Sequence, residues 1–284
     1  MASSTHVFDS PSLQRLLGNP AAVVGLTIVS IFVLLALTAD WLPLRNPVQI
    51  VPGNRMAGPS WGMPLGGDTF GRDVLSRIVF GARLTFQVSA FSVALALVAG
   101  TVLGLLAGYA GGWVDQLIMR TMDVLFAFPA ILLALGIVAA LGPDPKNVVI
   151  AIGVVYTPIF ARVVRAPVLV LKEREFVDAA RALGARASRI LARHILPNLF
   201  SVLVVQASIA LSWAVLTEAS LSFLGLSAQP PTASWGVMLN DGRQSLELAP
   251  HLAIFPGLAI MLAVLGFNLL GDGLRDVLDP RLRR

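Results

Sequence analysis

The sequence contains no cysteine and few charged residues, and both absences limit what the protein can be. Without cysteine there is no disulfide and no thiolate chemistry, although the compartment stays open. Charged residues make up only 13% of the 284 residues, against 56% hydrophobic residues, which excludes an ordinary water-soluble domain and indicates a bilayer protein. The net charge of +5 does not indicate nucleic acid, because the basic residues lie in short segments between apolar runs.

Lysine and histidine are also scarce, and their positions argue against nucleotide and metal sites. A phosphate-binding loop needs Gly-Lys followed by Ser or Thr, but Lys146 follows proline and Lys172 follows leucine. His6, His194 and His251 are too widely separated in the sequence to suggest one metal site. We therefore expect no metal site on this chain, and any ATP must bind elsewhere.

One short match to a hydrolase pattern carries no weight. Residues 58–62 spell G-x-S-x-G, but this motif has meaning only on a strand-to-helix turn with a histidine and an acid nearby. Here it lies in a loop rich in proline and glycine. We expect no catalytic residue on this chain.

Long apolar runs dominate what remains. A helix needs about 20 apolar residues to cross the hydrocarbon of a bilayer, where unsatisfied backbone groups cannot be hydrated. The first run is too long for a signal peptide and has Leu37 where a small residue is needed for cleavage. The sequence predicts an all-α membrane protein with six transmembrane helices, at residues 21–39, 84–110, 124–141, 147–167, 199–224 and 252–271.

The basic residues predict the orientation of these spans. With the N-terminus inside, 14 of the 21 basic residues fall in inner segments, so both termini are expected in the cytoplasm. The loop after the first span carries five arginines, but its three aspartates weaken the opposing count without reversing it. The fourth predicted span contains Arg162 and Arg165, which must reach an interface or find a partner.

Small residues recur in the second predicted span. Gly100, Gly104 and Gly108 follow a small-xxx-small spacing, which allows the backbone of another helix to approach closely. The alternative is that these glycines are merely tolerated on a lipid-facing surface. Three in register favour helix packing.

The segment 172–198, between the fourth and fifth spans, is charged and has room for two short helices. The first is expected near residues 173–183 and stops at Gly184, which suits the left-handed conformation after a helix end. The second runs to about Ile195, and Pro197 lies near the start of the fifth span.

A family resemblance rests on this segment. Asp178, Ala179 and Ala180, then Gly184, then residues 194–197 (His-Ile-Leu-Pro) resemble the EAA loop of permeases from binding-protein-dependent ABC importers. The resemblance implies that the segment is a coupling helix docking on a cytoplasmic ATPase subunit. Its interface residues would then be Asp178, Ala179, Ala180, Gly184, His194, Leu196 and Pro197. Asp178 departs from the usual glutamate, and its shorter arm affects any ion pair with the ATPase.

The residue types fit such docking. Two alanines and a glycine let a helix and its turn sit deep in a pocket, and a carboxylate can pair with a cation of the partner. The alternative is a basic loop that faces lipid headgroups through Arg186, Arg189 and Arg193. For the segment as a whole we favour docking, and for the three arginines both interpretations stay open.

The resemblance extends over nearly the whole chain. Residues 65–83, 218–236 and 267–280 carry patterns similar to the C-type permeases of the dipeptide, oligopeptide and nickel importer group, with Gly67 in place of the usual threonine. It implies the type I ABC importer permease fold, with residues 1–83 holding the tail, first helix and outer loop, and residues 84–284 forming the core. The implied partners are a homologous B-type permease, two ATPase subunits that bind ATP and magnesium, an extracytoplasmic solute-binding protein and membrane lipid.

Three residues near the predicted outer side are candidates for a gate or a structural role: Glu218, Ser220 and Trp235. Glu218 is a carboxylate in an apolar stretch, but 19 residues from Leu199 at about 1.5 Å each put it about 28 Å along the helix, near the outer interface. A structural pair or a helix-end role is therefore favoured over a substrate ligand. For the segment 227–250 a gate or docking surface and a plain surface loop anchored by Trp235 stay open.

Two rival classes fit the sequence less well. A secondary transporter would use ionisable residues within the membrane for coupling, and the predicted spans are nearly free of charge. A membrane-embedded hydrolase would need a convergent nucleophile, base and acid. Peptide uptake is the favoured substrate class, with nickel complexes as the alternative within the same group.

Overall fold

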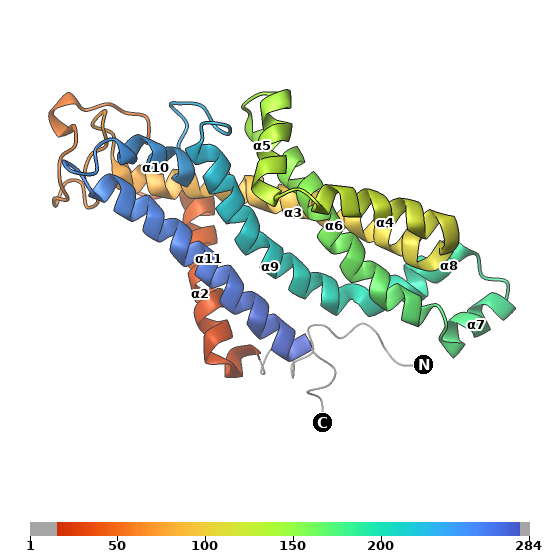
Figure 1. Cartoon of the computed structure of the whole chain (residues 1–284). Coiled ribbons are helices and arrows are strands. Elements are labelled where there is room, and N and C mark those ends of the chain that lie inside the picture. The colour runs from red at the N-terminus through yellow and green to blue at the C-terminus, as the bar shows by residue number, and fades with distance from the viewer. Residues whose placement is uncertain (1–15, 279–284) are drawn as a thin grey trace.

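A computed structural model describes residues 16–278, and these residues form helices and loops without any named strand (Figure 1). His6, Arg15, Arg281, Arg283, Arg284 and residues 279–280 of the third motif lie outside the described residues. The long helices are α2 (Pro20–Thr38), α3 (Val74–Ala110), α6 (Pro145–Leu171), α9 (Leu196–Phe223) and α11 (His251–Leu278). The shorter ones are η1 (Pro52–Asn54), α4 (Gly112–Phe126), α5 (Ala130–Leu141), α7 (Glu175–Ala182), α8 (Ala187–Ile190), the π-turn η2 (Leu191–Ile195) and α10 (Trp235–Arg243).

Five of these helices are long and apolar enough to cross a membrane, and the pair α4 and α5 brings the possible number to six. The fold class predicted from the sequence, an all-α membrane protein, is confirmed. The predicted fifth and sixth spans lie within a few residues of α9 and α11. Arg162 and Arg165 also behave as predicted, since each pairs with a carboxylate of α4.

The third predicted span, residues 124–141, is wrong as a straight helix. The chain bends by 91° between α4 and α5. Pro129 is the physical reason: it lacks the N–H that a continuous helix would need and disfavours helical geometry at Phe128 before it. With 12 residues, α5 is about 18 Å long and cannot cross the hydrocarbon alone.

The second span starts ten residues before the predicted residue 84. Asp73 caps α3, because its side chain accepts a hydrogen bond from the Ser76 N–H at 2.8 Å. A prediction based on apolar runs could not include the first turns of α3, because these turns are polar. At 37 residues α3 is about 55 Å long, so it projects beyond the bilayer core. A domain boundary at residue 83 would fall inside α3, and the division of the chain there stays a prediction.

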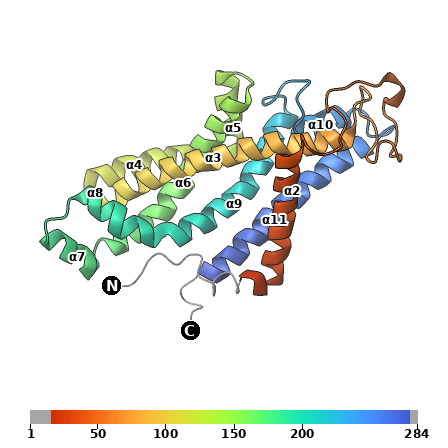
Figure 2. The same cartoon turned by 180° about the vertical axis from the view of Figure 1, so that it is seen from behind.

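The helices place two groups of loops at opposite ends of the molecule. In Figures 1 and 2, α7 lies at one end, while α10 and the loop between α2 and α3 lie at the other. Helices α3 and α9 run between the two ends, α6 runs from beside α5 to α7, and α2 packs against α11. Any event at α7 can therefore reach the far end through continuous helices.

The contact between α3 and α6 is the most extensive of these helix pairs. A Cβ atom added to Gly100 would lie 2.4 Å from the Phe160 Cβ, and one added to Gly104 would lie 2.5 Å from the Ala161 carbonyl oxygen. At Gly108 it would lie 2.8 Å from the Val168 Cβ. Real Cβ atoms do not approach other atoms this closely, so only glycine allows the two backbones to meet here.

A leucine at this contact should destabilise the fold. We expect Gly104→Leu to lower the free energy of unfolding by about 1–3 kcal/mol, because the added side chain has to displace the α6 backbone. Thermal unfolding of the purified protein in detergent measures this. Gly136→Leu on α5 is the matched control, since an added Cβ meets nothing within 4 Å there. Equal loss in both variants would contradict the role of the close contact.

Candidate functional site

The segment 172–198 forms the two short helices that the sequence predicts. The first, α7, ends in a Schellman motif: the Ala185 N–H donates to the Ala180 carbonyl at 3.0 Å and the Gly184 N–H to the Arg181 carbonyl at 2.9 Å. Gly184 has φ +76°, the left-handed conformation predicted for it. The second helix, α8, continues through the π-turn η2 into α9. The turn at Gly184 therefore sets the angle between α7 and the membrane helix.

The outer surface of α7 and its turn is small and accessible. Asp178, Ala179 and Gly184 are exposed, and Asp178 forms a surface ion pair with Arg181 at 2.9 Å. Ala180, which was grouped with these residues, differs from them, because it is only 8% exposed and packs inward. A methyl group buried in its own chain offers no surface to a partner.

Leu183 is the residue of this surface that the sequence reasoning missed. It caps α7 directly before Gly184 and is 88% exposed, and Phe176 on the same helix is 42% exposed. Large apolar side chains at a tip that touches nothing else are typical of protein contacts. The sequence did offer one indication of this role: Leu183 directly precedes Gly184, the glycine that ends the helix.

The inner face of the segment is anchored to two membrane helices. Val177 and Ala180 of α7 and Ile190 of α8 form one buried cluster with Val164 and Val168 of α6 and Ile195 and Leu199 near the start of α9. His194, Leu196 and Pro197 lie half-buried at this base, not at the tip. The buried side of α7 thus packs directly against α6 and the start of α9.

Tyr109, near the end of α3, adds a third connection. The Arg181 guanidinium lies 5.7 Å from the centre of the Tyr109 ring. The Tyr109 hydroxyl is also the main cause that raises the pKa of Arg181 above its ordinary value, and the charge of Asp178 adds to it. Helices α3, α6 and α9 therefore all contact the segment that carries α7.

These features fit a family model that matches most of the chain. The model for binding-protein-dependent transport system inner membrane components matches residues 100–284. The chain belongs to this permease family. A second model, for the N-terminal transmembrane domain of oligopeptide transport permease C, matches residues 12–59. The chain is therefore a multi-pass inner-membrane permease of an importer.

Relatives of this permease match it over nearly the whole length. It is 50% identical over 272 residues to the dipeptide transport system permease protein DppC of Alkalihalophilus pseudofirmus, covering 96% of this chain and 90% of the relative. It is 48% identical over 271 residues to the glutathione transport system permease protein GsiD of Pectobacterium atrosepticum, covering 95% and 90%. It is also 48% identical over 263 residues to the GsiD of an Escherichia coli strain, covering 92% and 87%.

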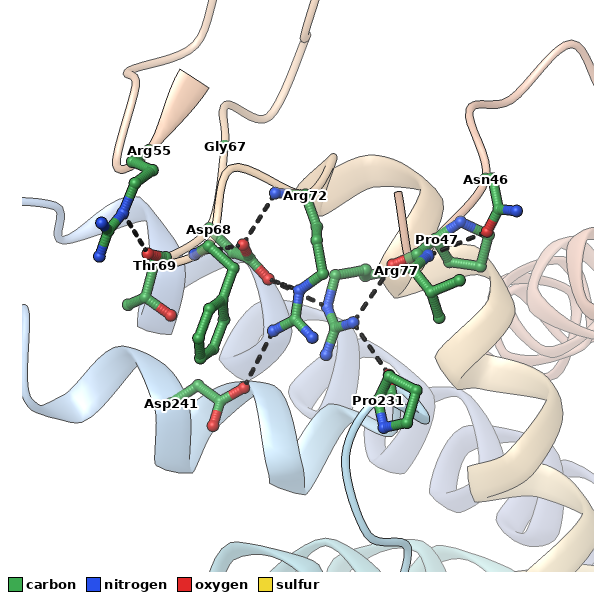
Figure 3. Close-up of polar contacts among 12 residues, drawn as sticks. Asn46, Pro47, Arg55, Gly67, Asp68, Thr69, Arg72, Arg77, Pro231 and Asp241 are labelled. Atoms are coloured by element: carbon green, nitrogen blue, oxygen red, sulfur yellow. Dashed lines mark hydrogen bonds and ion pairs between the residues drawn. The ribbon is translucent and has the colours of Figure 1, made fainter. Parts of the chain in front are cut away.

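At the other end of the permease, three buried charged side chains and the half-buried Asp241 form a network (Figure 3). Arg72 donates to Asp68 at 2.5 Å, and Arg77 lies 3.4 Å from the same carboxylate. Arg72 also lies 3.6 Å from Asp241 on α10. Burial raises the pKa of Asp241, while Arg77 and Arg72 oppose that shift. Two cations and two anions thus balance within the network.

Arg77 connects the loops at the end of the molecule that carries α10. It is 1% exposed and donates to the carbonyl of Pro47 in the loop after α2 at 3.2 Å and to that of Pro231 in the loop after α9 at 3.3 Å. Figure 3 shows its guanidinium between these two carbonyls and Asp68. One side chain therefore connects three segments that are far apart in the sequence.

Trp235 does not lie at the surface of the molecule, so the interpretation of this residue as an interfacial anchor is wrong. Its side chain is fully buried and donates from Nε1 to the Ile78 carbonyl at 2.9 Å. Its ring meets Phe32 and Phe86 edge-on at 5.3 and 5.4 Å. Aromatic contacts with α2 and α3 outweigh the lipid interface here.

Glu218 is buried near the C-terminal end of α9 and makes no ion pair within residues 16–278. The Ser222 hydroxyl donates to it at 2.5 Å, one turn later in the same helix. Ser220 is half-buried and donates back to the Leu216 carbonyl at 2.8 Å. It lines an apolar groove of about 390 Å³ between α9, α10 and α11. Of the three residues, Ser220 alone contributes to an open groove.

Proposed function

We propose that this chain is the C-type permease subunit of a bacterial ATP-driven importer of di- and oligopeptides and forms half of the translocation pathway. Relatives named for dipeptide and glutathione transport cover more than nine-tenths of the chain, which supports a peptide substrate. Glutathione is itself a small peptide-like molecule. A nickel complex is the alternative substrate within the same group.

The coupling proposal rests on one observation: α7 is exposed at its tip and anchored at its base to α6 and α9. We assign Asp178, Ala179, Leu183 and Gly184 to the contact with a cytoplasmic ATPase subunit. Ala180, His194, Leu196 and Pro197 then support this contact from behind. A rigid connector with an accessible apolar tip can convert closure of the ATPase subunits into tilting of the membrane helices.

The proposed complex contains a homologous B-type permease, two ATPase subunits and an extracytoplasmic solute-binding protein. ATP and magnesium bind to the ATPase subunits, and this chain carries no catalytic step. The network of Asp68, Arg72, Arg77 and Asp241 gives a firm outer platform for the binding protein. Glu218 and Trp235 have structural roles in this proposal, and Ser220 lies at the surface that can act in a gate.

Both termini are proposed to lie in the cytoplasm, with α7 on the same side. Cysteine-scanning is clean because the natural chain has no cysteine. We expect a membrane-impermeant maleimide to label Ser60→Cys in intact cells, and Arg186→Cys only after the membrane is opened. Both positions are exposed. Labelling from the opposite sides would overturn the orientation.

The function is tested with the complex purified through a tag on this chain. After reconstitution into vesicles, the rate of ATP hydrolysis should rise when binding protein loaded with dipeptide is added on the outer side. The same binding protein loaded with a nickel complex is the control for substrate class. Stimulation by the nickel complex alone would move the assignment to the alternative.

A further inference from the structure

Three arginines between α7 and α9 have no ion-pair partner among the described residues 16–278. Arg186, Arg189 and Arg193, here called the arginine stripe, are all exposed. Within residues 16–278 none of their guanidinium groups makes an ion pair or a hydrogen bond. These are three full positive charges within eight residues.

The sequence from 179 to 217 contains no acidic residue to balance them. No aspartate or glutamate occurs between Asp178 and Glu218, and Asp178 is already engaged with Arg181. The arginines of the neighbouring α6 differ, because Arg162 contacts Asp123 at 2.7 Å and Arg165 contacts Asp115 at 2.5 Å. The charge of the stripe is therefore available for a group outside this chain.

The depth of the stripe follows from helix lengths. The apolar helix α9 has 28 residues and is about 42 Å long, more than the hydrocarbon thickness of about 30 Å. If α9 is centred across the hydrocarbon, about 6 Å of helix extends beyond each boundary, and its start at Leu196 lies outside the hydrocarbon. Arg193 and Arg189 precede it by three and seven residues, about 4.5 and 10 Å along the axis, and so lie at headgroup depth.

An exposed apolar side chain adjoins the stripe on the membrane side. Phe200, on the first turns of α9 and about two turns after Arg193 on the same face of the helix, is 44% exposed. Cations at headgroup depth, followed directly by an apolar side chain open to the hydrocarbon, match the two parts of a phospholipid. A protein partner would meet such a surface only by displacing lipid from it.

We propose that the arginine stripe binds the phosphate groups of anionic phospholipids in the leaflet on the side of α7. The bound lipids hold the π-turn η2 and the start of α9 at a fixed depth, so that α7 projects to a defined height above the membrane. The tip of α7 keeps the apolar Leu183 for protein contact, and the stripe at its base is left to lipid. This inference does not depend on the substrate or on the ATPase contact.

The test is a lipid titration of the purified chain, followed by native mass spectrometry. Phosphatidylglycerol is compared with phosphatidylcholine of the same acyl chains. Each cation near an anionic surface contributes about a five-fold gain in affinity, so replacing all three arginines by glutamine should weaken phosphatidylglycerol binding on the order of 100-fold. Binding of phosphatidylcholine should stay unchanged.

The matched control replaces three exposed arginines at the opposite end, Arg45, Arg55 and Arg243, by glutamine. This variant should keep its preference for phosphatidylglycerol. Equal loss in both triple variants, or no loss in the stripe variant, would overturn the proposal. If the stripe variant keeps lipid binding but no longer recovers ATPase subunits from native membranes, the arginines face the ATPase instead. Should the triple variant fail to fold, Arg189→Gln alone should weaken binding about five-fold.

Discussion

Leu183→Asp should abolish the stimulation of ATP hydrolysis by loaded binding protein while the permease stays inserted in the membrane. Leu183 is 88% exposed at the tip of α7 and supports no packing within the permease. An apolar anchor buried in a partner's pocket contributes about 2 kcal/mol or more, and a charge would in addition be desolvated there. We expect association with the ATPase subunits to weaken by about 30-fold or more. Co-purification of ATPase subunits with the tagged permease measures this directly.

Two variants make this result specific. Leu183→Met keeps an apolar side chain of similar volume and should retain stimulation. Leu248→Asp places the same charge on a leucine that is 81% exposed near α10, at the other end of the molecule, and should leave ATPase recovery unchanged. If Leu183→Asp recovers ATPase subunits as well as the natural protein, α7 is not the docking element.

Arg77→Met should produce the largest loss of stability. Methionine fills a similar volume but removes the ion pair with Asp68 and both hydrogen bonds to loop carbonyls. Removing one cation from a buried ion-pair network costs about 3–5 kcal/mol, because the two carboxylates of Asp68 and Asp241 are then left with Arg72 as their one cationic partner in the network. We expect a lower unfolding midpoint in detergent. We also expect faster protease cleavage within residues 39–73, because methionine cannot make the hydrogen bond that fixes this loop to α3.

Arg45→Met is the control for Arg77→Met. Arg45 lies in the loop after α2, two residues before the Pro47 carbonyl that Arg77 contacts, but it is exposed and makes no ion pair within residues 16–278. Its replacement should change neither the midpoint nor the cleavage rate measurably. Equal protease resistance of the Arg77 variant and the natural protein would contradict the view that Arg77 connects the loops at this end of the molecule.

Features that depend on local chemistry could be predicted from the sequence. Gly184 ends α7 because a left-handed residue is needed there, and this requirement is visible in the sequence itself. The long apolar runs predicted the membrane helices, and the charges of Arg162 and Arg165 predicted that each needs a partner. The end of α7 depends on residues that are neighbours in the sequence. The partners of Arg162 and Arg165 could be expected because an unpaired charge within a membrane helix is costly.

Features that depend on contacts between distant segments could not be predicted. The network of Asp68, Arg72, Arg77 and Asp241 joins residues more than 150 positions apart, and one sequence contains no sign of that pairing. The burial of Trp235 likewise depends on aromatic rings from α2 and α3. The bend at Pro129 differs, since the proline was visible, but averaging hydropathy over the stretch concealed it.

The exposed surface of α7 lies between these cases. The motif pointed to the correct segment, but it grouped Ala179 and Ala180 together, although helix geometry turns one outward and the other into the cluster with α6 and α9. Leu183 was overlooked because the motif emphasises the glycine beside it. The side of a short helix that packs against the rest of its chain is decided by tertiary contacts, which the motif does not contain.

The most direct test of the account is transport by the complex purified through this chain and reconstituted into vesicles. Uptake of a labelled dipeptide is measured with loaded binding protein outside and either ATP or a non-hydrolysable analogue inside. The account predicts that a second permease and ATPase subunits co-purify, and that uptake requires ATP. Recovery of this chain alone, with uptake that proceeds without ATP, would contradict it.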